Sequence, residues 1–166
     1  RFRPVQLSRY VSTISNGGTC YDITLVDNVA DPAQNNKVKN NKATVRNELD
    51  IKSSTLNAIR SGMYMVVNNG SLKSVFQKVP VKVAGKTGTA QISANEPNHA
   101  LFVSYAPYDS PKISVAVVMP NAFTSSNAAS LASNVYQYSA IPEEWQTDQW
   151  RESEENYEST GSDQRK

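Results

Sequence analysis

The sequence contains little of what several common protein classes require. Its 166 residues include one cysteine, Cys20, and one histidine, His99. A single cysteine excludes an internal disulfide framework, and one cysteine with one histidine makes no metal-ligand cluster, so no metal site is expected. No apolar run reaches the roughly 18 residues of a membrane-spanning helix. The opening residues, RFRPVQLSRY, also lack the apolar stretch of a secretory signal peptide.

Charge is distributed unevenly along the chain. Residues 141–166 carry eight acidic and three basic side chains, a net charge of −5, whereas residues 1–140 carry a net charge of +7. A body this basic attracts anionic polymers, including nucleic acid and acidic wall polymers. Its lysines are scattered, however, and few aromatic residues interleave with them. We therefore expect no nucleic-acid partner.

Hydrophobic periodicity predicts an α+β domain in which helices flank an antiparallel sheet. Gly62 lies inside the second predicted helix, where we expect it to permit a close packing contact. The link between the last two predicted strands is short and rich in proline, which favours an antiparallel hairpin. The predicted helices cover residues 4–16, 53–70 and 125–138, and the predicted strands cover residues 81–91, 99–107 and 112–120.

Three other segments carry weaker patterns. Residues 21–29 have the composition of a short or edge strand, and residues 31–42, rich in Asn and Lys, predict a polar surface loop. After Pro142 the hydrophobic pattern stops, and the acidic sequence predicts a disordered tail. We therefore divide the chain into a domain of residues 1–140 and a tail of residues 141–166.

A polar sequence occupies the first predicted strand of the sheet. The segment VAGKTGTAQ, residues 83–91, contains one lysine, two threonines and two glycines. Gly-Lys-Thr also occurs in phosphate-binding loops, but such a loop requires a glycine five residues before Gly85, where this chain has Pro80. The residues after Gln91 continue toward another strand rather than into a helix. The pattern therefore disfavours a nucleotide site.

The same segment suits the binding of an acyl substrate. Side chains alternate along a strand, so Lys86 and Gly88 point to one face. Thr87 and Thr89 point to the other. Two hydroxyls and an ammonium group at a strand edge can hold a carboxylate, and Gly88 lets a substrate backbone approach as an added strand. The backbone N–H of Thr89 is placed to stabilise an oxyanion during acyl transfer.

Lys-Thr-Gly is one of three motifs of the serine acyltransferases of the β-lactamase and penicillin-binding type. The segments VAGKTGTAQ, HALFVSYAP and ISVAVVM, in this order, resemble the C-terminal part of the transpeptidase domain of class B penicillin-binding proteins. PVQLSRYVSTISNGG resembles the helix that follows the middle motif of this family, and IRSGMYMVVNNG resembles the helix that precedes the Lys-Thr-Gly strand. The resemblance covers residues 1–140. It departs from the family at Leu101, where tryptophan is common.

This resemblance implies a partial β-lactamase/transpeptidase-like fold and the function of a peptidoglycan D,D-transpeptidase, which needs no cofactor. In that family a serine attacks a stem peptide ending in D-Ala-D-Ala, D-alanine leaves, and the acyl group passes to the amine of a neighbouring stem. By motif, Thr87 and Thr89 bind the carboxylate of the stem peptide or of a β-lactam antibiotic, and Gly88 and Gln91 also bind substrate. Lys86 sets the positive potential, and the Thr89 N–H supplies half of the oxyanion hole.

The other two motifs of the family do not occur in their required positions. Ser-x-x-Lys, which holds the nucleophile, is absent, and Ser-x-Asn occurs only at residues 93–95 and 125–127, after Lys-Thr-Gly rather than before it. We expect Asn127 to lie at the start of the last helix instead. His99 is expected to precede a strand, and Cys20 lacks the context of a nucleophile.

We therefore interpret the chain as a C-terminal fragment that cannot acylate without the missing N-terminal part of the same protein. The resemblance implies work on the extracytoplasmic face of the bacterial cytoplasmic membrane, with the anchor outside this sequence. The alternative is a non-catalytic β-lactam sensor or wall-peptide-binding module on the same fold. A class A β-lactamase fits less well, because nothing here resembles its hydrolytic machinery. Upstream sequence distinguishes these possibilities: intact motifs indicate an enzyme, and substituted motifs indicate a binder.

Overall fold

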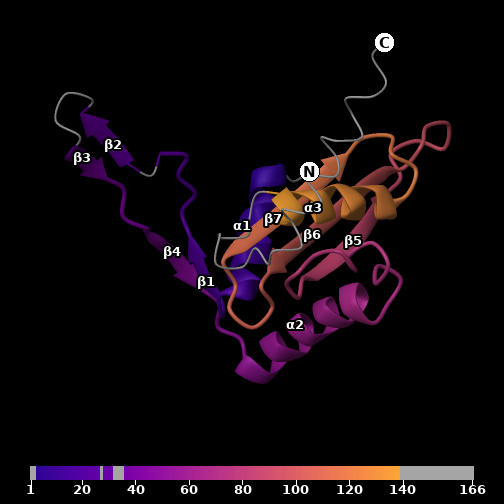
Figure 1. Cartoon of the computed structure of the whole chain (residues 1–166), viewed down its shortest axis with the longest axis horizontal. Helices are drawn as coiled ribbons and strands as arrows, with labels where there is room; N and C mark the ends of the chain where they lie inside the picture. The colour runs from indigo at the N-terminus through magenta and orange to yellow at the C-terminus, as the bar shows by residue number, and fades with distance from the viewer. Residues whose placement is uncertain (1–2, 27, 32–35, 139–166) are drawn as a thin grey trace, which may run out of the picture.

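A three-stranded antiparallel sheet with helices on both faces forms the body of the molecule (Figure 1). The computed structural model describes residues 3–26, 28–31 and 36–138. The helices are α1 (Pro4–Ser15), α2 (Ser53–Asn68) and α3 (Ser125–Tyr138), and the strands are β1 (Thr19–Tyr21), β2 (Asn28–Asp31), β3 (Asn36–Asn40), β4 (Val45–Glu48), β5 (Ala84–Ala90), β6 (His99–Ala106) and β7 (Ile113–Met119).

The sheet has the order β5-β6-β7, with both pairs antiparallel. Val103 in the central strand faces Lys86 of β5 on one side and Ala116 of β7 on the other. The backbone N–H of Lys112 donates to the carbonyl of Ala106 (2.9 Å) and closes the β6–β7 connection. The predicted α+β class, the three strands and the hairpin are therefore confirmed.

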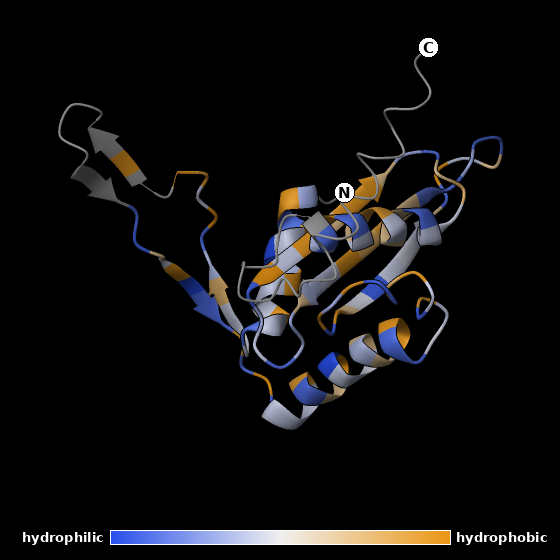
Figure 2. Cartoon of the chain, in the orientation of Figure 1, coloured by the Kyte–Doolittle hydropathy of each residue, from blue (hydrophilic) through white to orange (hydrophobic). Residues whose placement is uncertain are grey.

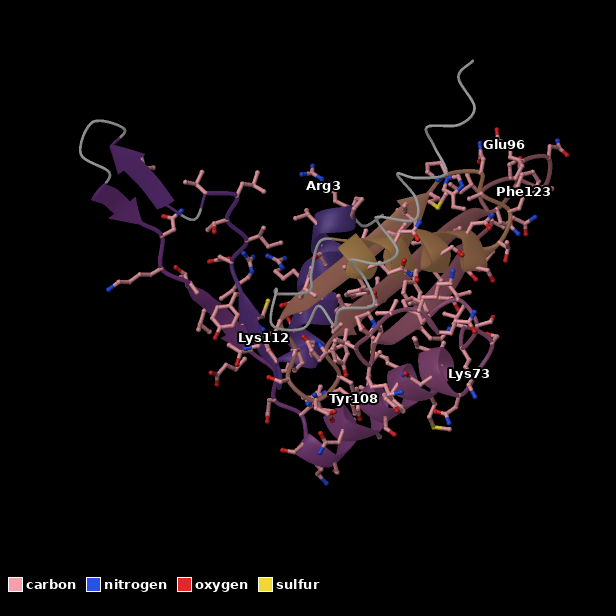
Figure 3. All side chains as sticks on the ribbon, viewed as in Figure 1. Arg3, Lys73, Glu96, Tyr108, Lys112 and Phe123 are labelled. Carbon is pink, nitrogen blue, oxygen red and sulfur yellow. The ribbon has the colours of Figure 1, made fainter. Side chains whose placement is uncertain are left out.

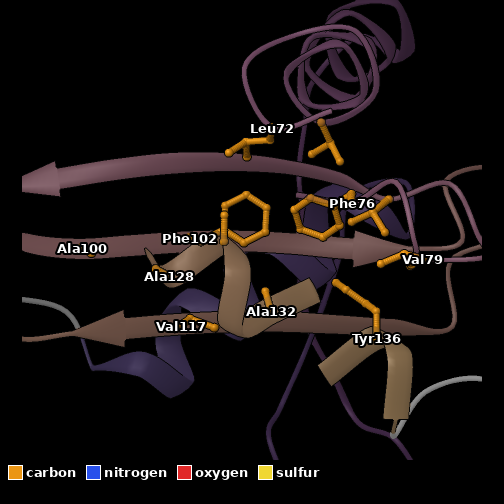
Figure 4. Packing of buried hydrophobic residues seen from close by; sticks show 13 residues of the cluster. Leu72, Phe76, Val79, Ala100, Phe102, Val117, Ala128, Ala132 and Tyr136 are labelled. Carbon is orange, nitrogen blue, oxygen red and sulfur yellow. The ribbon is translucent and has the colours of Figure 1, made fainter. Parts of the chain in front are cut away.

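One face of the sheet is covered by α3 together with residues 70–83, which connect α2 to β5 (Figure 4). The Phe76 and Phe102 rings pack with centroids 5.6 Å apart. Small alanines of α3, among them Ala128 and Ala132, lie against the strands and let the helix approach closely. Tyr136 brings a hydroxyl into this apolar layer and donates it to Ser104 Oγ (2.9 Å).

The opposite face of the sheet is covered by α1 and α2. Val11 and Ile14 of α1 and Leu56 and Met63 of α2 form a second buried cluster with Tyr105 and Ala84 of the sheet. The predicted helix 4–16 is confirmed by α1 (Pro4–Ser15). At its start, Gln6 Oε1 accepts the Arg3 backbone N–H (2.8 Å). Gly17 and Gly18 end it at φ angles of 94° and 110°, which glycine adopts without a Cβ penalty.

An arginine holds the turn after β6 against α2. Arg60 Nη2 donates to the carbonyl of Tyr108 (3.1 Å), and its Nε donates to the Tyr105 hydroxyl (3.3 Å). The guanidinium also lies 5.7 Å from the centroid of the Tyr108 ring, within cation–π range. The Tyr64 ring packs on Tyr108 with centroids 4.7 Å apart. These contacts fix the end of the sheet that lies away from the Glu96 loop (Figure 3).

Residues 19–26, 28–31 and 36–48 form a projecting arm instead of a strand followed by a loop (Figure 1). β1 pairs antiparallel with β4, and β2 pairs antiparallel with β3. The predicted single strand over residues 21–29 is wrong, because residues 22–26 lie between β1 and β2. The predicted loop over residues 31–42 is also wrong, since residues 36–40 form β3. Cross-strand pairing with β2 overrides the weak strand propensity of Asn and Lys in β3.

The prediction for Gly62 is also wrong. It lies on the exposed side of α2, and a Cβ added there would meet no atom within 4 Å. The predicted tail of residues 141–166 lies outside the described residues. Within the described part of the chain, no helix is long and apolar enough to cross a membrane. Figure 2 shows the apolar residues of the body concentrated on the sheet and on the sides of the helices that face it.

Candidate functional site

The Lys-Thr-Gly-Thr sequence lies on β5, at an edge of the sheet. β5 pairs with β6 along its whole length, and the described residues place no strand on its other side. Lys86, Thr87, Gly88 and Thr89 are strand residues, and Gln91 follows one residue beyond the strand end at Ala90. Every second residue of such an edge strand turns its backbone N–H and C=O outward, where they are available to an added strand.

The site side chains alternate as the sequence predicts. Thr87 and Thr89 pair with Phe102 and Ala100, and so belong to the sheet face that α3 covers. Lys86 lies on the opposite face, where it is exposed, and its Nζ donates to the Thr87 carbonyl (2.9 Å). Thr87 is half-buried and Thr89 is exposed, so the hydroxyls become more accessible toward the end of the strand.

The two glycines of this strand, Gly85 and Gly88, differ in the space available for a side chain. A Cβ at Gly85 would lie 2.4 Å from Cζ of Phe102, so the packing of the core requires glycine there. A Cβ at Gly88 would meet only Leu101 Cβ at 3.5 Å, an ordinary van der Waals contact. The chain's own packing therefore leaves room for a side chain at Gly88. Sequence reasoning assigned a role to Gly88 and missed Gly85, because only the packed structure shows that the Phe102 ring lies over it.

The stretch of sequence that contains the site is basic. No acidic residue occurs between Asp50 and Glu96, whereas this stretch contains Lys86 and five further basic residues. In the part of the chain that the structure describes, the ion pair between Arg46 and Asp22 is the only one, so the Lys86 ammonium group has no carboxylate partner there. A ligand carboxylate would supply such a partner.

Beyond β5, the turn after β7 holds two non-glycine residues in the left-handed region. Asn121 has a φ of 53° and Phe123 a φ of 62°, a conformation that is costly for a bulky side chain. His99 Nδ1 accepts the Asn121 N–H (3.2 Å), and the Phe123 N–H donates to the Asn98 carbonyl (3.1 Å). Phe123 is 72% exposed and lies at the same end of the sheet as Glu96 (Figure 3). No sequence pattern had indicated this turn.

The remaining candidates take local structural roles. The Asn95 N–H donates to Ser93 Oγ (3.2 Å) within the β5–β6 connection. Asn127 lies in the first turn of α3, where its Nδ2 donates to the Ala122 carbonyl (2.9 Å). His99 is the first residue of β6. The prediction that Asn127 lies at the start of the last helix agrees with its position, whereas His99 belongs to the strand that it was predicted to precede.

Cys20 is a free, half-buried thiol on β1. It lines an apolar hollow of about 430 Å³ between α1 and the β1–β4 pair, together with Tyr10, Thr13 and Leu49. No group of three or more His, Cys, Asp or Glu side chains able to hold a metal ion occurs within residues 3–26, 28–31 and 36–138.

The arrangement on β5 is chemically a binding wall. It combines an exposed strand edge, two hydroxyls, an ammonium group without a carboxylate partner and a glycine that leaves space, which together suit an extended peptide with a carboxylate. Within the described part of the chain, the Lys86 ammonium group donates to the Thr87 carbonyl and not to a serine hydroxyl. The wall therefore offers hydrogen-bonding groups and a positive charge at an open strand edge, without a serine hydroxyl on its lysine among the described residues.

Three comparisons with known proteins identify what the chain is similar to. The family model described as "Penicillin binding protein transpeptidase domain" matches residues 3–137. Penicillin-binding protein 2A of Bacillus subtilis is 33% identical over 132 residues, covering 72% of this chain and 18% of that protein. Peptidoglycan D,D-transpeptidase MrdA of Haemophilus influenzae is 43% identical over 98 residues, covering 49% of this chain and 15% of that protein.

Among solved structures, penicillin-binding protein 2B from Streptococcus pneumoniae strain R6 superposes with a TM-score of 0.73 and 28% identity. The match covers 85% of this chain and 26% of that chain. The chain therefore spans less than a fifth of the curated relatives' length and about a quarter of this solved relative.

Proposed function

The chain belongs to the penicillin-binding protein transpeptidase domain family, and we propose that it forms the carboxylate-binding wall of a peptidoglycan D,D-transpeptidase. Its ligand is a stem peptide ending in D-Ala-D-Ala, or a β-lactam antibiotic that takes its place. Family membership supports the proposal, and so do the names of the two curated relatives.

Each residue of the wall has one proposed role. The hydroxyls of Thr87 and Thr89 bind the carboxylate of the terminal D-alanine or of the β-lactam, and Lys86 provides the positive potential that attracts it. The backbone N–H of Thr89 donates to the oxygen that becomes negative when the carbonyl is attacked. Gln91, just past the strand, contacts the peptide further along.

Gly88 is the observation that carries this proposal. The chain's own atoms leave ordinary van der Waals space for a Cβ at this position, on the open edge strand of the sheet. Folding therefore does not explain the glycine. A peptide added to β5 does explain it, because its backbone comes close to the strand and a Cβ there would hold it away.

We further propose that the nucleophile comes from outside this chain. The short coverage of every relative described above supports this view. In the complete reaction, a serine hydroxyl attacks the carbonyl of D-Ala-D-Ala, D-alanine leaves as the amine, and the acyl-serine passes the peptide to an amine of a neighbouring stem. The reaction takes place on the extracytoplasmic face of the cytoplasmic membrane.

Labelling with fluorescent penicillin tests both proposals. This polypeptide alone is expected to show no covalent label, whereas the longer parent protein is labelled on a serine outside residues 1–166. In the parent, Thr89→Val is expected to slow acylation about tenfold or more, the cost of a lost hydrogen bond to a charged group. Thr55→Val, at an exposed position on α2, is the matched control and leaves the rate unchanged.

Each of the opposite outcomes has a definite meaning. Covalent labelling of the isolated chain would show that it holds its own nucleophile. Equal labelling rates for Thr89→Val and Thr55→Val would remove Thr89 from the binding wall. A parent protein that binds penicillin reversibly, without acylation, would be the non-catalytic sensor or wall-peptide binder.

A further inference from the structure

A polar hollow of about 320 Å³ lies on the side of the molecule that α3 covers. Residues 74–78 form one wall and the second half of α3 forms the other. None of its lining residues belongs to the binding wall on β5. The polar side chains that line it include Ser74, Gln77, Lys78, Ser133, Asn134 and Gln137.

The charges around this hollow are of one sign. The wall segment of residues 70–83 contains three lysines and no acidic residue, and α3 contains no charged residue at all. Lys78 is exposed and lines the hollow. Since the described residues contain a single ion pair, between Arg46 and Asp22, the Lys78 ammonium group has no carboxylate partner among them. The hollow thus offers a positive charge that no described carboxylate neutralises.

A buried serine fixes the floor of the hollow. Ser133 is 3% exposed, and its hydroxyl donates to the Val75 carbonyl (3.0 Å), which ties α3 to the opposite wall. Its Oγ also accepts a hydrogen bond from Gln137 Nε2 (3.3 Å), which orients that amide. The two walls are therefore held at a set separation before any ligand arrives, which lowers the entropy cost of binding.

The hollow offers one positive charge and several hydrogen-bonding groups. The ammonium group of Lys78 donates, and the amides of Gln77, Asn134 and Gln137 both donate and accept. Among the residues that the structure describes, no carboxylate lines the hollow, and neither does an aromatic ring on which a sugar could stack. Because this half of α3 leads to the helix C-terminus, the helix dipole does not favour an anion there, and the side chains must bind it. An anion with several oxygens and polar flanks fits best.

We propose that this hollow binds the phosphodiester of a polyol phosphate, such as a glycerophosphoglycerol unit. Lys78 holds the single negative charge, and the amides and hydroxyls bind the phosphate oxygens and the hydroxyls of the flanking polyol. The volume lies at the lower end of the range for small-molecule sites. The same chemical unit occurs in soluble polyol-phosphate polymers and in phospholipid headgroups. The inference does not depend on the proposed transpeptidase function.

The test is a titration of the whole chain with glycerophosphoglycerol, followed by backbone amide NMR shifts. Saturable shifts are expected in residues 74–78 and in the second half of α3, with a midpoint of roughly 1 to 10 mM. Lys78→Gln is expected to weaken binding about tenfold, the cost of one charge-assisted hydrogen bond. Lys73→Gln is the matched control, because Lys73 belongs to the same segment, is exposed and does not line the hollow (Figure 3). It is expected to change the affinity less than twofold.

Three results would overturn the proposal. Equal shifts of the same amides by glycerol and by the phosphodiester would mean that charge plays no part. Equal weakening of binding by Lys73→Gln and by Lys78→Gln would indicate a diffuse charge effect. No shifts in either wall would mean that the hollow binds no such ligand.

A second measurement identifies the source of the phosphodiester. Vesicles of phosphatidylglycerol and of phosphatidylcholine are floated with the chain and with both lysine variants. If the chain binds phosphatidylglycerol vesicles, and Lys78→Gln abolishes this binding while Lys73→Gln does not, the phosphodiester bound in the hollow is that of a lipid headgroup. Binding of soluble glycerophosphoglycerol with no vesicle binding assigns a soluble polymer.

Discussion

The Tyr136 hydroxyl donates a hydrogen bond to Ser104 Oγ at 2.9 Å, between two side chains that have no exposed surface. It joins α3 to the central strand of the sheet. The pair is embedded among apolar residues, where a polar group without a partner is costly. Removal of either hydroxyl therefore leaves the other buried without this hydrogen-bond partner.

Tyr136→Phe is expected to destabilise the fold by about 1 to 3 kcal/mol, because it leaves the Ser104 hydroxyl buried and without its partner. Ser104→Ala should cost a similar amount, since it orphans the tyrosine hydroxyl. The double variant should cost less than the sum of the two. Urea denaturation of all four proteins measures this coupling, and strict additivity would contradict it.

Alkaline pH should weaken the fold through the same tyrosine. Burial raises the pKa of Tyr136 well above its ordinary value of 10.0, and burial also raises the pKa of Tyr105, although the Arg60 hydrogen bond and charge oppose this. In the unfolded chain both lose their protons near pH 10, so the unfolded state binds fewer protons above that pH. The stability that these groups contribute is thus complete below about pH 10 and is lost progressively above it.

Denaturation curves at pH 8, 9.5, 10.5 and 11 would measure this decline. Tyr136→Phe has no phenolic proton at position 136. Its free energy of unfolding should therefore fall less between pH 10 and 11 than that of the unchanged protein. Parallel declines in the two proteins would show that Tyr136 does not carry the effect.

Gly85→Ala and Gly88→Ala form a matched pair on one strand. Gly85→Ala should destabilise the chain by about 1 to 3 kcal/mol, because its Cβ would overlap the buried Phe102 ring. Gly88→Ala should change stability by less than about 0.5 kcal/mol and instead slow penicillin acylation of the parent protein. Thermal denaturation measures the stability of both variants, and the kinetics of penicillin labelling measure the acylation rate of the parent protein. A large loss of stability in Gly88→Ala would remove the main support for the proposed strand addition.

Gly62→Ala should stabilise the chain by about 0.5 to 1 kcal/mol. Gly62 is exposed inside α2, and the space around its Cα is free of other atoms, so alanine adds helix propensity without a clash. A rise in the melting temperature measures the gain. Gly70→Ala is the contrasting variant, because its Cβ would lie 2.9 Å from the Val66 carbonyl oxygen. Equal effects of the two substitutions would contradict this explanation.

The elements that the sequence predicts well are those whose signals are local. Pro4, the apolar spacing of α1 and the two glycines after it define one helix without reference to the rest of the chain. Alternation in β6 and β7 defines the hairpin in the same way. The motif on β5 likewise places Lys86 and its neighbours, since period-2 alternation fixes the two faces.

What the sequence does not show depends on contacts between elements. β2 and β3 are strands because they pair with each other, and their Asn and Lys content gives no strand pattern. The need for glycine at position 85 arises from the Phe102 ring of β6, which packs over it although the cross-strand partner of Gly85 is Ser104. The hollow beside Lys78 has walls from two segments on either side of the sheet sequence, so no local pattern can indicate it.

The last strand of the sheet has a consequence for the isolated polypeptide. β7, Ile113–Met119, contains no charged residue and no proline, and within the described residues it pairs only with β6. Natural proteins guard such edges with lysine, proline or a bulge, because an unguarded one recruits copies of itself. The chain on its own is therefore a candidate for self-association into stacked strands. A lysine substituted into β7, or a complementary strand supplied as a separate peptide, would be the direct way to keep the chain soluble at high concentration.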